Sequence, residues 1–350
     1  MLIHPKPERS SDFSIYNGDV EEFLDSIASD GPCFKLIVTS PPYNIGKEYE
    51  KRTSLEEYLE WQRRAIEKMV ALLLPGGSLC WQVGNHVDNG TITPLDIVFH
   101  PIFDSLGLKL RNRVVWKFGH GLHAKRRFSG RYEVVMWYTK GDDYTFNLDP
   151  VRVPQKYPGK KHYKGPKAGQ YSGNPLGKNP EDVWEIPNVK SKHVEKTDHP
   201  CQYPVGLIEP LVLALTNPGD MVFDPFAGVC TTGVAAALHG RRFMGCEIDK
   251  GSHTSLRVSE MRKLLRENGL PVSGNKEILR NRLEGSGVIR PSYAKTGASR
   301  ILEAIEGRSK FRPWGKKLME ASKSRLSDMP EEMAEARMAA QTLLNPENET

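Results

Sequence analysis

Between residues 13 and 258, short apolar runs alternate with longer amphipathic stretches, and this pattern predicts strands separated by helices. The near-continuous apolar run over residues 34–39 predicts a strand buried on both faces, and residues 54–74 predict the helix that follows. Pro75-Gly76-Gly77 would close that helix, and residues 78–83 would form the next strand. Strand, helix and strand in this order are typical of a parallel sheet covered by helices.

The alternation continues through two further strands, a long polar region and a second strand–helix–strand unit. The remaining strands are expected over residues 111–117, 131–139, 221–226 and 242–249, and helices over residues 204–216 and 231–239. Beyond residue 251 the glycine-bounded strands stop and the chain becomes helical and charged. We therefore expect a main domain over residues 1–258, a small helical module over 259–285, and a helical or flexible tail over 286–350.

Composition excludes several classes of protein. With 38% hydrophobic and 26% charged residues, the chain is typical of a soluble globular protein rather than a collagenous or disordered one. A membrane span needs about 20 apolar residues, and the start MLIHPKPERSSDF lacks the apolar core of a signal peptide. The five scattered cysteines form no C-x-x-C pair. We expect a cytoplasmic protein with reduced thiols and no metal.

Positive charge is concentrated in one part of the polar region. Residues 151–178 contain three tyrosines and no acidic residue, together with seven basic residues: Arg152, Lys156, Lys160, Lys161, Lys164, Lys167 and Lys178. Cations and flat rings in a loop-rich stretch are suited to contact a polyanion, the alternative being a solvated surface loop. Arg126 and Arg127, in the earlier connection GHGLHAKRR, could contact phosphates as well.

The second strand–helix unit contains a turn suited to a nucleoside-bearing cofactor. Its sequence, from Asp224 through Phe226 and Gly228 to Thr231-Thr232-Gly233, places small residues where a ligand could approach the backbone. The helix start offers unpaired N–H groups to an anion, and the two threonine hydroxyls could add to that site. Nineteen residues after Gly228, Glu247 closes the next strand, where a carboxylate could accept hydrogen bonds from ribose hydroxyls.

The strongest motif is Val38-Thr39-Ser40-Pro41-Pro42-Tyr43, at the end of the first predicted buried strand. Two prolines hold the backbone rigid, so that a carbonyl and a side-chain oxygen can face one amine, and the aromatic ring gives a flipped base a stacking surface. The motif resembles the catalytic signature, in its serine form, of DNA methyltransferases that methylate exocyclic amines. A purely structural double-proline turn is the alternative.

The resemblance extends over most of residues 13–250. Asn17-Gly18-Asp19 resembles the family's short acidic cofactor motif, and His199-Pro200 resembles the segment that leads into the cofactor turn. Arg131-Tyr132-Glu133 is similar to the block before the target-recognition region. The order of catalytic motif, recognition region and cofactor motif is that of the permuted β group.

This resemblance implies an α/β, doubly wound fold that binds S-adenosylmethionine. Its Rossmann-like mixed sheet would carry an inserted target-recognition region over residues 141–198 and a small helical C-terminal extension. The implied catalytic residues are Ser40, Pro41, Pro42 and Tyr43. The implied cofactor residues are Asp19, Asp224, Phe226, Gly228, Thr231, Thr232 and Glu247. The DNA-contacting residues are predicted to be Arg126, Arg127, Lys160, Lys161 and Lys164.

The implied reaction moves the methyl group of S-adenosylmethionine to the N4 amine of cytosine in double-stranded DNA. Serine at position 40 leans toward cytosine and aspartate toward adenine, but serine-form enzymes that act on adenine exist, so N6-adenine methylation is the alternative. Cys230 stands where the family usually has glycine, which allows a second alternative: a DNA-binding or regulatory protein of low activity. A dehydrogenase would leave the double-proline motif and the basic stretch unexplained.

The segment after the main domain has a resemblance of its own. Residues 261–283 are similar to a SAP module, a small helix pair that binds DNA, with matching leucines and Gly269, Gly274 and Lys276. A helical extension that packs on the main domain is the alternative. The sequence predicts DNA as the partner and no membrane. It leaves open a restriction–modification or a solitary role, with or without a cognate restriction endonuclease, and a monomer or a homodimer.

Overall fold

The computed structural model describes residues 3–4, 12–44, 52–121, 123–157, 159–174, 176–190, 192–248, 257–286 and 292–309. Its centre is a nine-stranded sheet in the order β1-β2-β11-β10-β3-β4-β8-β7-β9. The strands are β1 (Ile3–His4), β2 (Phe13–Asn17), β3 (Phe34–Thr39), β4 (Leu73–Val83), β7 (Lys109–Lys117), β8 (Tyr132–Thr139), β9 (Val183–Glu185), β10 (Met221–Asp224) and β11 (Arg242–Glu247). A separate hairpin joins β5 (Asn85–Asp88) to β6 (Thr91–Pro94).

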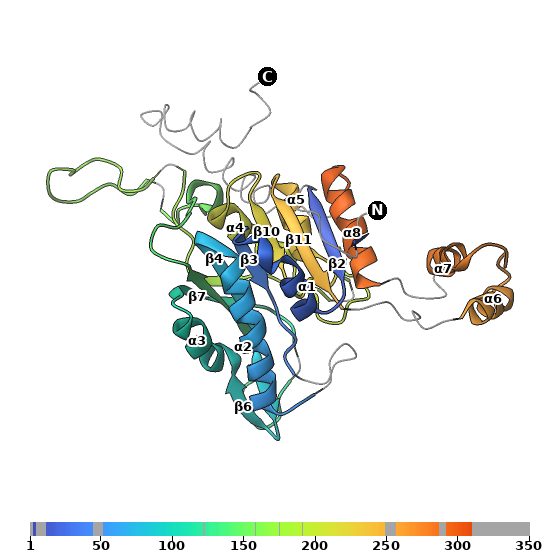
Figure 1. The fold of residues 1–350 in the computed structure, drawn as a ribbon. Coiled ribbons are helices and arrows are strands. Elements are labelled where there is room, and N and C mark those ends of the chain that lie inside the picture. The colour runs from blue at the N-terminus through green and yellow to red at the C-terminus, as the bar shows by residue number, and fades with distance from the viewer. Residues whose placement is uncertain are drawn as a thin grey trace.

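Helices cover both faces of this sheet (Figure 1). One face packs against α1 (Val20–Ile27), α2 (Leu55–Leu72) and α3 (Leu95–Ser105), which share one hydrophobic core with it. The other packs against α4 (Val205–Leu215), α5 (Thr231–Leu238) and α8 (Tyr293–Ile305) around a second core. Two short 3₁₀ turns, η1 (Ala28–Asp30) and η2 (Asp149–Val151), complete the layers. Three layers of this kind confirm the predicted doubly wound α/β fold.

The sheet is mixed, because its strands run in two directions. β1, β2, β11, β10, β3 and β4 are all parallel to one another. β8 pairs antiparallel to β4 and β7 antiparallel to β8, while β9 is parallel to β7. The carboxyl ends of β3, β4, β10 and β11 therefore share one edge of the sheet with the end of β7 and the start of β8.

One predicted turn is part of a strand instead. The sequence pattern placed Pro75-Gly76-Gly77 between a helix and a strand, but β4 begins at Leu73 and includes all three residues. The backbone N–H of Gly76 donates to Lys140 O at 2.8 Å, and Lys140 N–H donates to Gly77 O at 3.0 Å. Gly76 has φ +68, so the glycines form an irregularity in the strand that still pairs with the end of β8.

The basic stretch of the sequence, within residues 151–178, forms an arm (Figure 1). The arm leaves the sheet at the edge opposite to the carboxyl ends of β3, β4, β10 and β11. At its base, Val153 and Lys178 exchange backbone hydrogen bonds of 2.9 Å each. Just before the arm, Asn147 Nδ2 donates to Thr216 O at 2.9 Å, beside the carboxyl end of α4. Because α4 leads into β10, this end of α4 lies at the amino-terminal edge of the strands.

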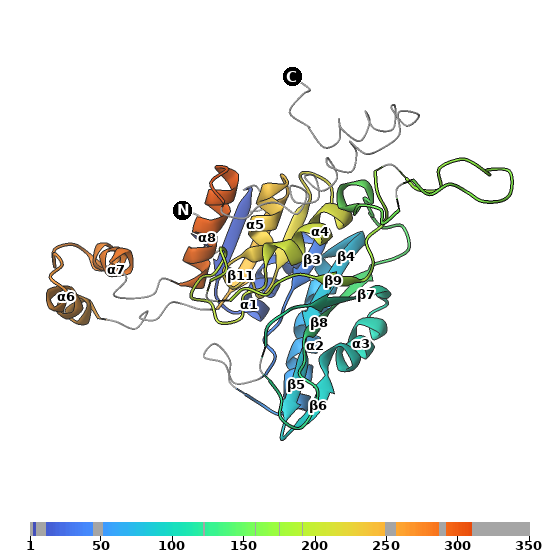
Figure 2. The same cartoon turned by 180° about the vertical axis from the view of Figure 1, so that it is seen from behind.

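Helices α6 (Val258–Glu267) and α7 (Lys276–Gly285) pack against each other, away from the sheet (Figure 2). Their small core consists of Met261, Leu265, Leu279 and Leu283, all with no exposed surface. Ile278 lies outside it and is 46% exposed. The pair contacts α8 through an ion pair in which Lys295 Nζ lies 2.5 Å from Glu284 Oε2.

Helix α8 falls within the region that the sequence analysis assigned to a tail, yet it belongs to the second core of the sheet. Ala294, Ala298 and Ile301 are buried there against α5 and its neighbours. Gly297 faces the turn before α5, where Cys230 has the left-handed φ of +54 and no exposed surface. The sulfur of Cys230 lies so close that a Cβ at residue 297 would be 2.4 Å from it.

No helix within the described ranges is both long and apolar enough to cross a membrane.

Gly297→Ala is expected to lower the free energy of unfolding by about 1–3 kcal/mol, because the added methyl group overpacks the contact with Cys230. Cys230→Gly removes the sulfur, so the double variant should recover most of that loss. Urea unfolding of the full-length protein measures both effects. Gly285→Ala in α7 is the matched control, since a Cβ there meets nothing within 4 Å. If Gly297→Ala lowers the free energy of unfolding by the same amount in the wild-type protein and in the Cys230→Gly protein, this packing is contradicted.

Candidate active site

The carboxylate of Asp224, at the end of β10, joins the two motifs that the sequence singles out. Thr39 Oγ1 donates to Asp224 Oδ1 at 2.6 Å, and the backbone N–H of Phe226 donates to the same oxygen at 3.2 Å. Thr232 Oγ1 and the hydroxyl of Tyr203 donate to Oδ2 at 2.6 and 2.7 Å. Strand β3, the turn after β10, the first turn of α5 and the segment before α4 are thereby held together at one point.

Asp224 has no exposed surface, so its environment is set entirely by the protein. Burial raises the pKa of the Asp224 carboxyl, and the four hydrogen bonds oppose that rise. Burial likewise raises the pKa of Tyr203 well above its usual value. Asp224 and Thr232, predicted to bind a cofactor, have their side-chain oxygens engaged with each other. Their hydrogen bond holds the turn between β10 and α5 in place from the interior of the protein.

The turn after β10 lies against the end of β11. The backbone N–H of Gly228 donates to Glu247 Oε2 at 2.7 Å, and Ala227 N–H donates to Cys246 O at 2.8 Å. Glu247 O in turn accepts from Gly18 N–H at 2.9 Å, which brings in the end of β2. The predicted cofactor residues Gly228 and Glu247 are therefore in direct contact, with Glu247 only 8% exposed.

Two side chains at the end of β2, Asp19 and Asn17, have different surroundings. Asp19 caps α1, since its carboxylate accepts from the N–H groups of Glu21 and Glu22 at 2.8 and 3.3 Å. Asn17, which pairs with Glu247 in register, has a buried side-chain oxygen with no hydrogen-bond partner among the described residues. Buried acceptors are normally satisfied, so this orphaned oxygen beside Glu247 fits a nucleoside that donates to it.

Two further features make the turn a cradle for a ligand. Gly228 has the left-handed φ of +50, and a Cβ there would lie 3.1 Å from His199 Nε2, so both the backbone and the packing favour glycine at this position. The ring of Phe226 lies 5.8 Å from that of Trp61 and 6.3 Å from that of Trp81, between α2 and β4. The partly exposed, apolar ring of Phe226 next to the turn fits a purine base.

The start of α5 is braced by α8. Arg300 Nη1 donates to Val229 O at 2.6 Å and to Thr231 Oγ1 at 3.1 Å. Its Nη2 lies 3.6 Å from Glu195 Oε2. Sequence reasoning missed Arg300, because it lies on a helix beyond the predicted domain boundary and no local signal ties it to the turn.

The loop Ser40–Pro41–Pro42–Tyr43 begins directly after β3 and is anchored by α2. Tyr58 of α2 donates its hydroxyl to Pro42 O at 2.5 Å. Asn44, with a left-handed φ of +56, exchanges two hydrogen bonds of 2.8 Å with the backbone of Thr53. The carbonyl of Pro42 is thus used inside the protein.

A chain of polar side chains extends from Ser40 into the sheet. Ser40 Oγ donates to the hydroxyl of Tyr43 at 3.1 Å, and that hydroxyl lies 3.0 Å from Gln82 Oε1 and 3.3 Å from Glu133 Oε2. Gln82 Nε2 donates to the same oxygen of Glu133. Gln82 is the last residue but one of β4 and Glu133 is the second residue of β8, so only the antiparallel pairing of these strands brings them together. Neither residue was predicted from the sequence to have a role in the site.

The predicted DNA-contacting residues are divided between the two edges of the sheet. Arg126 and Arg127 are exposed on the loop between β7 and β8, at the same edge as Ser40, next to the 99%-exposed Phe128. Lys160, Lys161 and Lys164 are exposed on the arm at the opposite edge, where Lys161 Nζ lies 4.7 Å from the centre of the Tyr171 ring. The structure does not bring the two groups together.

The segment after β9 adds positive charge to the edge that carries Ser40. It contains the exposed residues Lys190, Lys192 and Lys196, and Asn188 Nδ2 ties it to His120 O at 3.0 Å. Sequence reasoning placed this segment in the recognition region without singling out these lysines. These lysines alternate with acidic and apolar residues, so they form no run of positive charge that would identify them in the sequence.

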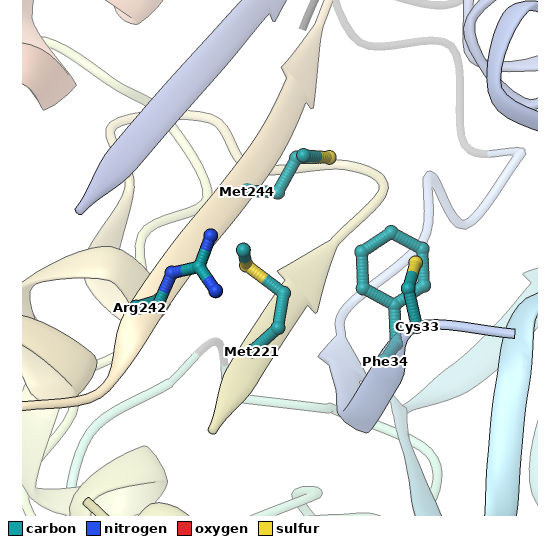
Figure 3. Close-up of a pocket in the computed structure, with 5 residues that line it drawn as sticks. All are labelled: Cys33, Phe34, Met221, Arg242 and Met244. Carbon is teal, nitrogen blue, oxygen red and sulfur yellow. The ribbon is translucent and has the colours of Figure 1, made fainter. Parts of the chain in front are cut away.

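Two cavities lie near the ends of the strands. One of about 70 Å³ is lined by Cys33, Phe34, Met221, Arg242 and Met244 at the amino ends of β3, β10 and β11, away from the motifs (Figure 3). Another of about 130 Å³ is lined by Gly84, Asp96, Arg113, Tyr132 and Glu133, among others, beside the Ser40 loop. Within the described part of the chain, no cluster of His, Cys, Asp or Glu is arranged to hold a metal ion.

Comparison with known proteins agrees with this geometry. A family model described as DNA methylase, covering enzymes of the N6/N4 type, matches residues 34–272. The type II methyltransferase M.BglII of Bacillus subtilis is 49% identical over 280 residues, which cover 79% of this chain and 76% of that protein. The DNA adenine methyltransferase YhdJ of Escherichia coli strain K12 is 31% identical over 244 residues, covering 67% of this chain and 78% of that protein.

A solved structure shares the fold. The PvuII DNA methyltransferase, described as cytosine-N4-specific, superimposes with a TM-score of 0.56 and 20% identity, covering 87% of this chain and 96% of that one. The matched family segment begins at β3 and extends beyond β11, so it includes the Ser40 loop, the turn after β10 and Glu247. The chain therefore belongs to the N6/N4 DNA methylase family and is a DNA methyltransferase.

Proposed function

We propose that this enzyme transfers the methyl group of S-adenosylmethionine to the exocyclic N4 amine of a cytosine that is flipped out of double-stranded DNA. The observation that carries the proposal is the hydrogen bond of 2.6 Å between Thr39 and Asp224. It holds the Ser40 loop and the Gly228 turn at one edge of the sheet, so that an amine acceptor site and a nucleoside cradle face one crevice.

S-adenosylmethionine would supply an electrophilic methyl group on a sulfonium. Glu247 would accept from the ribose hydroxyls, Asn17 and Phe226 would contact the adenine, and the start of α5 near Thr231 would receive the methionine carboxylate. Helix starts favour anions because their N–H groups lack partners within the helix. Asp19 supports this arrangement by capping α1 and setting the end of β2.

The Ser40 loop would prepare the amine for attack. An aromatic amine is a poor nucleophile because its lone pair is delocalised into the ring. Ser40 Oγ and the carbonyl of Pro41 would accept its two N–H groups and hold the lone pair in line with the methyl group. Pro42 fixes the loop through the bond from Tyr58, and Tyr43 would stack on the extruded base.

N6 methylation of adenine is the alternative within the same site. Ser40 favours cytosine by its resemblance to the serine form of the motif, and the PvuII enzyme that shares the fold is named for cytosine N4. The relative YhdJ is named for adenine. Both amines are attached to an aromatic ring beside a ring nitrogen, so the loop geometry suits either one.

A binding protein of low activity is the second alternative, and the packing of Cys230 speaks against it. Its side chain is fully buried beside Gly297, so the sulfur lies between the turn and α8. The residue that departs from the family's glycine therefore occupies space that α8 provides, and Gly228 keeps its contact with Glu247.

DNA would lie along the edge that carries Ser40, against Arg126 and Arg127. The arm lysines Lys160, Lys161 and Lys164 and the SAP-like helix pair stay predictions as DNA contacts. The relative M.BglII is named a type II methyltransferase, and on that likeness a role in restriction and modification is proposed for this enzyme.

The first test identifies the methylated base. The protein is incubated with unmethylated mixed-sequence DNA and methyl-labelled S-adenosylmethionine, and the DNA is digested to nucleosides. Label on N4-methylcytosine is expected. Label on N6-methyladenine would move the substrate to the alternative, and absence of label together with absence of cofactor binding would make the binding protein the better account.

Glu247→Ala should raise the dissociation constant of S-adenosylmethionine about 10-fold or more, because a buried carboxylate that bonds to ribose is lost. Isothermal titration of the full-length protein measures this. Glu60→Ala on the exposed side of α2 is the control. Unchanged affinity in Glu247→Ala would remove this residue from the cofactor site.

Arg126→Ala combined with Arg127→Ala should weaken DNA binding on any sequence, because phosphate contacts release counterions without reading bases. The plot of log affinity against log salt concentration should become shallower by about 1–2. Arg63→Ala on α2 is the control for loss of surface charge, and a triple Lys160, Lys161 and Lys164 to alanine variant tests the arm separately. A slope unchanged by the arginine pair would place DNA elsewhere.

A further inference from the structure

We propose that Glu133 accepts, through the hydroxyls of Tyr43 and Ser40, the proton that the methylated amine must lose. This rests on the proposed function, since it assumes that the amine lies on the Ser40 loop. Glu133 itself would touch neither the amine nor the methyl donor. It is a positioning residue that acts through Tyr43.

The geometry provides a continuous path of hydroxyl groups. Ser40 Oγ lies 3.1 Å from the Tyr43 hydroxyl, which lies 3.3 Å from Glu133 Oε2. Gln82 braces both ends, because its amide nitrogen donates to Glu133 and its amide oxygen lies 3.0 Å from the Tyr43 hydroxyl. A buried carboxylate in such a network needs its donors, and the side chains of Tyr43 and Gln82 supply two.

The proton balance of the reaction calls for such an acceptor. When the neutral amine attacks, the nitrogen–methyl bond forms, the sulfur–methyl bond breaks, and the nitrogen becomes cationic. The amine then gives a proton to Ser40 Oγ, Ser40 gives its own proton to the Tyr43 hydroxyl, and Tyr43 gives its proton to the carboxylate of Glu133. The product amine is neutral, both hydroxyls are restored, and Glu133 ends as a carboxylic acid.

A route to solvent lies on the other side of Glu133. Glu133 lines the cavity of about 130 Å³ and is partly exposed. The same cavity is lined by Arg113 and Asp96, which form an ion pair with each other, and by the exposed Tyr132. Water entering there could take the proton and return Glu133 to its ionised form.

The electrostatics are consistent with a proton acceptor. Burial raises the pKa of the Glu133 carboxyl, while the hydrogen bonds from Gln82 and Tyr43 oppose that rise. Burial and the nearby Glu133 carboxylate raise the pKa of Tyr43 well above its usual value, so Tyr43 carries a proton that it can pass on. As the pH falls through the raised pKa of Glu133, the carboxyl becomes protonated and the path closes. The rate should therefore fall on the acid side.

The test is the single-turnover rate of methyl transfer as a function of pH, with saturating DNA and S-adenosylmethionine. Glu133→Gln is expected to lower the rate at neutral pH about 100-fold, within the range for general-base groups, and to abolish the acid-side fall. Glu133→Asp should keep part of the rate and the acid-side fall. Glu60→Gln on α2 is the matched control. Unfolding midpoints and cofactor affinity, measured for each variant, separate loss of structure from loss of the path.

The double variant Tyr43→Phe with Glu133→Gln should be no slower than the slower single variant, since both interrupt one path. A Glu133→Gln enzyme with the wild-type rate and pH profile would overturn the path. So would equal losses in the Gln and Asp variants with the wild-type pH profile, because that result indicates a structural role alone. A wild-type protein that transfers no methyl group would instead refute the proposed function.

Discussion

One buried carboxylate holds this active site together. Asp224 has no exposed surface and receives four hydrogen bonds from segments that are far apart in the chain: the end of β3, the turn after β10, the start of α5 and the segment before α4. Leaving a buried polar partner unsatisfied costs about 1–3 kcal/mol for each group. The Ser40 loop and the turn after β10 therefore keep a fixed spacing, and the proposed reaction would depend on that spacing because methyl transfer needs the nitrogen, the carbon and the sulfur in line.

The same edge depends on a helix from far along the chain. Helix α8 contributes Gly297, which makes room for the sulfur of Cys230, and Arg300, which donates to Val229 and Thr231. A non-glycine residue at φ +54 is strained by about 1–3 kcal/mol, and it keeps this conformation only because the surrounding structure holds it there. Cys230 in the turn and Gly297 of α8 therefore depend on each other's packing. The domain built on the sheet includes α8, which follows the helix pair α6 and α7 in the chain.

The basic residues lie at two different edges of the sheet, because the direction of the neighbouring strands decides where each loop emerges. Arg126, Arg127 and the lysines after β9 lie at the edge with the Ser40 loop, where the proposed function places the duplex. The arm with Lys160 and Lys161 leaves from the other edge (Figure 1). The basic stretch of residues 151–178 is thus not the positive charge nearest to the Ser40 loop. The edge of the sheet at which a basic loop lies is set by the direction of the strands on either side of it. The number of charges in the loop gives no information on that direction.

The sequence by itself determined the features that are local. The apolar run Phe34–Thr39, the double proline after it, and the glycine turn followed by Glu247 are each encoded within a few residues, because burial and turn geometry act over that distance. Tertiary structure decided the rest. Gln82 meets Glu133 only because β8 runs antiparallel to β4, and Arg300 reaches Thr231 only because α8 packs beside α5. These contacts join residues about 50 and 70 positions apart, and pairing and packing over such distances leave no periodic signal in a single sequence.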